Sequence, residues 1–177
     1  EGITNMSTSL SDVADVIRSD RIMTGANLVG KTVFGQTGRI STDGQSVSQI
    51  EVYLPYGAEQ VDFGIYDMNS GALIRSIVSG PQGSGTASFG WDGRMADGTA
   101  APVGDYVIRG TANIDGAATD IYPSTFAKVD TVSWDAQSSN LNLNLAGGVT
   151  LPISEVSRIG ETPKPSSLTN QTDQAGE

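Results

Sequence analysis

The sequence contains no histidine and no cysteine among its 177 residues. Without these side chains, the Ser-His-Asp and Cys-His triads of nucleophilic catalysis cannot form, and neither can a zinc site made of cysteine and histidine. Disulfide bonds are excluded as well, and the absence of cysteine does not by itself identify a cellular compartment. The classes of function that remain are catalysis by carboxylates and non-enzymatic roles.

Basic residues are also scarce, since 10 Lys and Arg stand against 20 Asp and Glu and give a formal net charge of −10. Nucleic-acid binding depends on clustered basic side chains that neutralise phosphates, and an anionic membrane surface repels an acidic chain. No apolar run approaches the ~20 residues that cross a bilayer, and no secretory signal is recognisable. We therefore expect neither nucleic acid nor a membrane among the partners.

The sequence is rich in glycine, with 22 residues, and has the alternation that is typical of β-strands. Residues 47–54 and 60–67 place an apolar side chain at every second position, which predicts strands with one buried face. Asp115-Gly116 is the signal of a two-residue β-hairpin, and Leu141–Leu145 reads as a half-buried strand. Turn signals at such short and regular spacing are typical of a β-sandwich or barrel.

The first residues predict a short helix instead. Ser9-x-x-Asp12 has the form of a helix start, and Gly25 stands where such a helix would end. The apolar positions at helical spacing are Leu10, Val13, Ala14 and Ile17. Because a helix so short and polar is marginal alone in water, we expect it to pack on a partner or on its own domain. A chain that starts at Glu1 and not at Met is expected to be part of a longer protein.

The stretch from Ser88 to Tyr106 concentrates turn signals between two strands. Residues 86–91 alternate small polar and apolar side chains, and two Asp-Gly dipeptides follow, in which glycine adopts a positive φ. We call these residues the Trp91 motif: Phe89, Trp91, Asp92, Gly93, Asp97, Gly98, Pro102, Gly104 and Tyr106. We predict that Trp91 and Tyr106 are buried and that the segment between them is a compact turn.

The order F-x-W-D-G, D-G, P-x-G-x-Y resembles the bacterial flagellar hook-capping (hook assembly scaffold, FlgD-type) proteins. Two further matches are Leu28-Val29-Gly30-Lys31-x-Val33 and an ending marked by Val129, Leu141–Leu145 and Ile153–Ile159. Together the matches extend from about Met6 to Ile159, which is most of the chain.

From the residues alone, the first and last strands either join one large sandwich or pair with each other across an inserted domain. The resemblance implies the second arrangement: an all-β fold in which a fibronectin-III-like sandwich is inserted in a small tudor/SH3-like barrel. The implied ranges are 1–27 for the helical segment, 28–45 plus 117–160 for the barrel, 46–116 for the sandwich and 161–177 for a disordered tail. We also predict thin linkers between the two domains, which would leave them free to reorient.

The resemblance implies a non-enzymatic function. Proteins of this family cap the growing hook, promote the incorporation of hook protein subunits and are displaced when the hook is complete. They leave the cell unfolded through the flagellar type III apparatus, and they act at the extracellular tip. We expect that the longer N-terminal region of the family, tied to export and cap assembly, lies outside the given sequence. We expect a homo-oligomer formed through the N-terminal region, and the candidate contacts are Leu10, Val13 and Ile17.

Carboxylate pairs are the remaining catalytic candidates, and Asp92 and Asp97 are the best placed. Both precede glycine, where aspartate commonly shapes a turn, so we expect no catalytic residue. Asp67-x-Asn69-x-Gly71 resembles the opening of a calcium loop, but its twelfth position is Val78, not a bidentate acid. We therefore expect no metal and no cofactor.

Trp91 has a second interpretation. An exposed indole would offer a platform for stacking a sugar, and the chain would then be an extracellular carbohydrate-binding sandwich. Tyr122, Phe126 and Trp134 are a further candidate group, because three such rings can form an aromatic cage. Core packing is the simpler role for all four rings.

Overall fold

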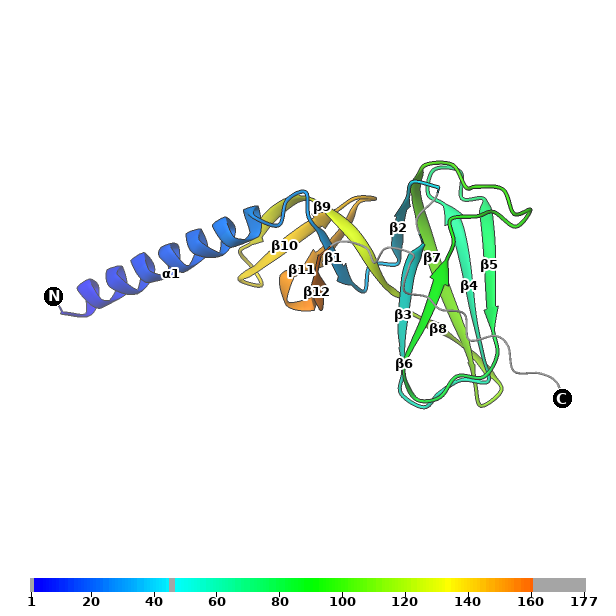
Figure 1. Ribbon diagram of the computed structural model, residues 1–177. Helices are drawn as coiled ribbons and strands as arrows, with labels where there is room; N and C mark the ends of the chain where they lie inside the picture. Colours follow the sequence, from blue (N-terminus) through cyan, green and yellow to red (C-terminus); the bar gives the residue numbers. More distant parts are fainter. Residues whose placement is uncertain (1, 45–46, 161–177) are drawn as a thin grey trace.

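The computed structural model describes residues 2–44 and 47–160, and its regular structure is made of strands, one N-terminal α-helix and one short 3-10 turn (Figure 1). The predicted all-β class with an N-terminal helix is confirmed, and the predicted tail at 161–177 lies outside the described residues. The elements are α1 (Gly2–Ala26), β1 (Thr32–Gly35), β2 (Arg39–Thr42), β3 (Ser48–Leu54), β4 (Gln60–Asp67), β5 (Leu73–Ser79), β6 (Gly85–Trp91), β7 (Gly104–Ile114), β8 (Ala117–Ile121), β9 (Ser124–Asp135), β10 (Asn140–Leu145), β11 (Val149–Pro152), the 3-10 turn η1 (Ile153–Glu155) and β12 (Arg158–Ile159).

Helix α1 extends away from the strands and touches them only near its C-terminal end (Figure 1). It begins at Gly2, and not at the predicted cap Ser9, so Ser9 lies inside the helix. The cap signal was misleading because serine in a helix interior lowers stability only slightly and does not end the helix. At the other end, a Cβ on Gly25 would lie 2.3 Å from Cδ2 of Leu141, so a larger residue at this position would force the buried Leu141 side chain of β10 to move.

Strands β2 to β8 form what we call the sandwich unit. One sheet has the order β2-β7-β4-β5 with β8 also beside β7, and the facing sheet contains β3 and β6. The predicted alternation in β3 and β4 is confirmed, because every second side chain in each is buried. Between the sheets lies a hydrophobic core: Ile40, Ile50, Val52, Leu54, Val61, Phe63, Ile65, Ala87, Trp91, Ala101, Tyr106, Ile108 and Ala112.

Strands β1 and β9 to β12 form what we call the barrel unit, with the order β11-β10-β9-β1-β12. The alternating sequence of β10 buries its three leucines, as the pattern predicted. The barrel unit has a separate core: Leu28, Val33, Ala127, Val129, Leu143, Leu145 and Leu151. The sandwich unit is thus inserted, in sequence order, between β1 and β9.

Two strands belong to a different unit from the one predicted. Strand β2 lies within 28–45 and β8 within 117–160, the ranges assigned to the barrel, yet both pair with β7 of the sandwich unit. For β8 the reason is the predicted hairpin itself: Asp115 and Gly116 have φ of 52° and 76°, and such a two-residue turn folds a strand directly back on its predecessor.

The two units are joined by more than the thin linkers that were predicted. Strand β9 begins beside β3, where Thr125 pairs with Ile50, and continues into the barrel unit beside β1 and β10. Thr125 is fully buried. Its hydroxyl oxygen lies 2.5 Å from the hydroxyl oxygen of Thr37, and it donates a hydrogen bond of 2.5 Å to the carbonyl of Arg39. Continuous backbone pairing through β9 therefore couples the units.

Candidate functional site

The Trp91 motif contains two buried aromatic side chains, and the polar atom of each donates a hydrogen bond. The rings of Trp91 and Tyr106 are both 1% exposed and meet edge to face, with centroids 5.1 Å apart. The indole Nε1 of Trp91 donates to the carbonyl of Arg94 at 2.9 Å, and the Tyr106 hydroxyl donates to the carbonyl of Pro102 at 2.6 Å. The predicted burial is confirmed, and burial raises the pKa of Tyr106, with a smaller contribution from the charge of Asp67.

The two Asp-Gly dipeptides of the motif are turns held by the aspartates. Asp92 accepts a hydrogen bond from the amide of Arg94, and Asp97 accepts one from the amide of Thr99 and another from its hydroxyl. The bonds from Thr99, the hydroxyl first, lower the pKa of Asp97. Gly93 and Gly98, with φ of 71° and 84°, provide the positive φ that each turn requires.

Further bonds make the segment between Trp91 and Tyr106 compact, as predicted, and fix it to the sandwich unit. The amide of Ala101 donates to the carbonyl of Gly93 at 2.8 Å, which closes the turn on itself. The amide of Ala96 and the guanidinium of Arg75 tie the segment to β5. The motif thus directs the chain out of β6 and into β7. Both of its carboxylates accept hydrogen bonds within the turns, so they do not form a free pair.

The aromatic alternatives do not fit this arrangement. With its ring 1% exposed, Trp91 offers no face on which a sugar ring can stack. Phe126 packs edge to face on Phe34, with centroids 4.7 Å apart. Trp134 stands eight positions further along β9, which corresponds to about 26 Å of extended strand, so these rings do not form one cage.

The candidate oligomer contacts lie on the exposed part of α1. Leu10, Val13 and Ile17 are 67%, 55% and 49% exposed, so nothing in the described part of the chain covers them. Sequence reasoning brought these three together correctly as neighbours on a helix, and the structure places this part of the helix away from both units, although the C-terminal end of α1 contacts the barrel unit (Figure 1). No helix in the described ranges is long and apolar enough to cross a membrane.

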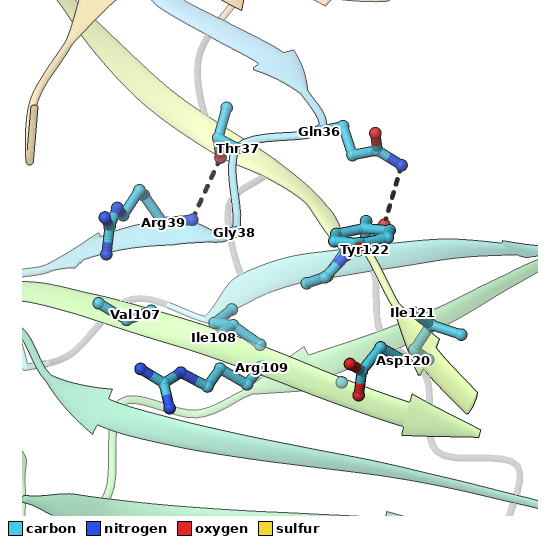
Figure 2. A pocket seen from close by; sticks show the side chains of 12 residues that line it. Gln36, Thr37, Gly38, Arg39, Val107, Ile108, Arg109, Asp120, Ile121 and Tyr122 are labelled. Atoms are coloured by element: carbon cyan, nitrogen blue, oxygen red, sulfur yellow. Dashed lines mark hydrogen bonds between the residues drawn. The ribbon is translucent and has the colours of Figure 1, made fainter. Parts of the chain in front are cut away.

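A hollow that the sequence did not predict lies where the units meet. Its volume is about 340 Å³, and it is lined by the segments 36–39, 107–110 and 120–123. Figure 2 shows Arg109 and Asp120 at its wall, and the side-chain amide of Gln36 donates to the carbonyl of Tyr122 at 3.3 Å across it. It lies where β7 passes from pairing with β2 to pairing with β8, and no local pattern in the sequence indicates this gap.

The hollow and the motif hold no arrangement suited to metal binding or proton transfer. Within residues 2–44 and 47–160 there is no group of three or more carboxylates that is placed to hold a metal ion. Asp120 is the single carboxylate of the hollow, and the other polar side chains at its wall include two arginines, which do not exchange protons near neutral pH.

Comparison with known proteins identifies the family. The sequence profile of the FlgD Ig-like domain matches residues 37–116, a range that includes β2 and the whole Trp91 motif. The basal-body rod modification protein FlgD of Escherichia coli is 31% identical over 157 residues, which cover 85% of this chain and 68% of that protein. The chain belongs to the FlgD family. The predicted resemblance is confirmed, and the chain spans about two thirds of the length of this relative.

Solved FlgD structures have the same architecture. FlgD from Pseudomonas aeruginosa is 32% identical, with a TM-score of 0.66 over 75% of this chain and 98% of that one. FlgD from Xanthomonas campestris is 28% identical, with a TM-score of 0.59 over 79% of this chain and 99% of that one. The latter structure is described as giving insights into the hook capping essential for flagellar assembly.

Proposed function

We propose that this chain is part of a flagellar hook cap: a non-enzymatic scaffold that promotes assembly of hook subunits at the distal end of the growing hook and is absent from the finished flagellum. The observation that carries the proposal is membership of the FlgD family, which includes the X. campestris protein discussed for hook capping. The hook protein is then the partner. The chain would reach the extracellular tip of the hook through the flagellar type III apparatus.

The carboxylates support a structural role over a catalytic one. The pKa values of Asp67, Asp97 and Asp135 are all lowered by hydrogen bonds from a nearby hydroxyl and from backbone amides. A general acid at neutral pH needs the opposite shift, because it must keep its proton until the reaction. These aspartates are suited to holding turns.

We further propose that copies of the chain contact one another through α1. Leu10, Val13 and Ile17 are separated by three and then four residues, and at 100° per residue they form one stripe along the helix. In the sequence, Ile3 and Met6 continue the same three-four spacing. This spacing is that of a coiled-coil seam, in which each apolar side chain packs between residues of a neighbouring helix.

The strength of this contact fits an assembly that must later come apart. Burial of a large aliphatic side chain contributes about 1.5–3 kcal/mol when it is complete. Since Leu10, Val13 and Ile17 are about half to two thirds exposed, their burial would contribute roughly 3–5 kcal/mol per helix. Association costs about 4–15 kcal/mol, so this seam is reversible unless the rest of the cap adds contacts.

Complementation tests the function. The full-length gene is expected to restore hooks, seen in electron micrographs, to a strain that lacks its hook-cap gene. Leu10→Asp combined with Ile17→Asp should reduce the number of hooks, because two charges interrupt the seam. Ser11→Asp combined with Ser19→Asp adds the same two charges at exposed positions more than 120° away around the helix and is the matched control. If the unaltered gene restores no hooks, the hook-cap proposal fails.

Sedimentation tests the oligomer contacts separately. In analytical ultracentrifugation, residues 1–177 should associate at high concentration, whereas residues 28–177 should remain monomeric. The double variant Leu10→Asp, Ile17→Asp should behave like the shortened chain. If both lengths form the same stable oligomer, the interface lies on the β units and α1 is not the assembly element.

A further inference from the structure

A single arginine of the barrel unit reaches the sandwich unit. Arg158, in β12, places Nη2 2.7 Å from Oε1 of Glu51 in β3. Its guanidinium carbon also lies 3.8 Å from the ring centroid of Phe34 and 5.5 Å from that of Phe126. The two rings pack edge to face against each other, and the guanidinium lies over them. The ion pair therefore joins side chains from two units with separate hydrophobic cores.

The carboxylate of Glu51 is also bound by a neighbouring residue of its own strand. The side-chain amide of Gln49 donates a hydrogen bond of 2.6 Å to the same Oε1 that Arg158 approaches. Glu51 also stands directly beside Ser124, the first residue of β9, where the backbone passes from one unit to the other. The ion pair thus lies next to the point about which the units would turn.

The element that carries Arg158 is short and weakly fastened. Strand β12 contains only Arg158 and Ile159, and within the described ranges it pairs with β1 alone. Ile159 is 55% exposed, so it adds little buried apolar surface. Few backbone bonds and little burial mark segments that open locally long before a domain unfolds. The contact between units is therefore carried by an exposed two-residue strand, which is held to β1 by the backbone bonds of β12 and by those of Ser157 and Gly160 beside it.

Glycine in a turn of the barrel unit allows the two units to lie close together. Gly147, in the turn between β10 and β11, faces the sandwich unit, because a Cβ built there would lie 3.2 Å from Sδ of Met68. Met68 follows β4, on the loop to β5. A side chain at position 147 would therefore meet Met68, so glycine here allows the turn to lie close to the sandwich unit.

We propose that Arg158 is a releasable latch that fixes the orientation of the barrel unit relative to the sandwich unit. With the Arg158–Glu51 pair formed, the units keep one orientation; with it broken, they pivot about the first residues of β9. A hinge of this kind moves rigid units through changes in a few residues at an element end. The latch goes beyond the hook-cap proposal, since it holds for this chain whatever partner the chain has.

The latch should depend on the planar guanidinium and on salt. A lysine at 158 would keep the charge but lose the flat stacking on Phe34 and the fork of donors, so it should hold the units less well. The side chains of Arg158 and Glu51 are 43% and 20% exposed, so added salt should weaken their attraction. Neither effect is expected if the backbone pairing of β9 alone fixes the orientation.

The experiment measures the distance between the units by double electron–electron resonance. Because the chain has no cysteine, Val78→Cys in the sandwich unit and Gln137→Cys in the barrel unit, both at exposed positions, give two unique sites for spin labels. Labelled chains of residues 1–177 are diluted with unlabelled chain to remove distances between copies. The expected distribution at 50 mM salt is a single narrow peak, which broadens at 1 M salt.

Three variants decide the proposal. Arg158→Ala and Glu51→Gln should each at least double the width of the distribution at 50 mM salt, and Arg158→Lys should fall between them and the unaltered chain. Arg94→Ala, which removes a guanidinium that bonds to Gly98 within the sandwich unit, is the matched control and should change nothing. Circular dichroism verifies that each variant is folded. If Glu51→Gln folds and leaves the distribution unchanged at both salt concentrations, the latch does not exist.

Discussion

Replacement of Trp91 by alanine should remove a large part of the stability of the sandwich unit. The indole is 1% exposed, packs edge to face on Tyr106 and donates its Nε1 proton to the carbonyl of Arg94. Truncation of a buried Trp to Ala typically costs about 3–5 kcal/mol, through lost transfer energy and the cavity that remains. Since small domains are stable by about 5–15 kcal/mol, a substantial share of the folding free energy would be lost.

Two further variants divide this cost into its parts. Trp91→Phe keeps a buried ring but leaves the Arg94 carbonyl without its donor, which should cost about 1–3 kcal/mol. Tyr106→Phe removes only the hydroxyl that bonds to Pro102, and about 0.5–1.5 kcal/mol is expected. Tyr56→Ala, at a position that is 86% exposed, is the control and should change stability by less than about 0.5 kcal/mol.

Urea unfolding provides the measurement. Far-ultraviolet circular dichroism follows the loss of strands, while Trp134 in β9 remains as a fluorescent reporter within the barrel unit when Trp91 is replaced. If Trp91→Ala lowers the free energy of unfolding by less than roughly 1 kcal/mol, the indole is not part of the core. An equal cost for Trp91→Phe and Trp91→Ala would also contradict the reasoning, because it would leave no separate contribution from packing.

Two other predictions concern pH and the limits of the sandwich unit. The folded pKa of Asp67 is lowered by its bonds from Ser70, so the unfolded chain binds more protons near pH 4. The stability from Asp67 should be complete above about pH 5 and fall as pH drops through the folded value. Asp67→Asn should flatten this dependence in urea titrations from pH 6 to 2.5. Residues 37–123, which contain β2 to β8 and their core, should give a cooperative melt alone; a fragment without one would show that the units fold together.

Local patterns in the sequence determined much of this protein. The alternation in β3 and β4 predicted which side chains are buried, since a strand turns successive side chains to opposite faces. Asp115-Gly116 predicted a hairpin, because glycine and aspartate tolerate the positive φ that its tight turn requires. The burial of Trp91 and Tyr106 followed from the same alternation and from the turn signals between them.

The helix shows where a local signal was outweighed. Ser9-x-x-Asp12 has the form of a cap, yet α1 begins at Gly2. A serine hydroxyl caps a helix only where the preceding residues leave the helical conformation, and here they continue in it. The three-four spacing of Leu10, Val13 and Ile17, by contrast, correctly indicated a shared face on the helix.

Only the tertiary structure decided which unit each short strand joined and how the units were linked. Strand β2 pairs with β7 more than sixty residues later, and Arg158 contacts Glu51 more than a hundred residues earlier. Alternation identifies the buried face of a strand but carries no information about its neighbour, because any partner of matching register satisfies the same backbone groups. Those partners are selected by the packing of whole sheets, which depends on all the strands at once.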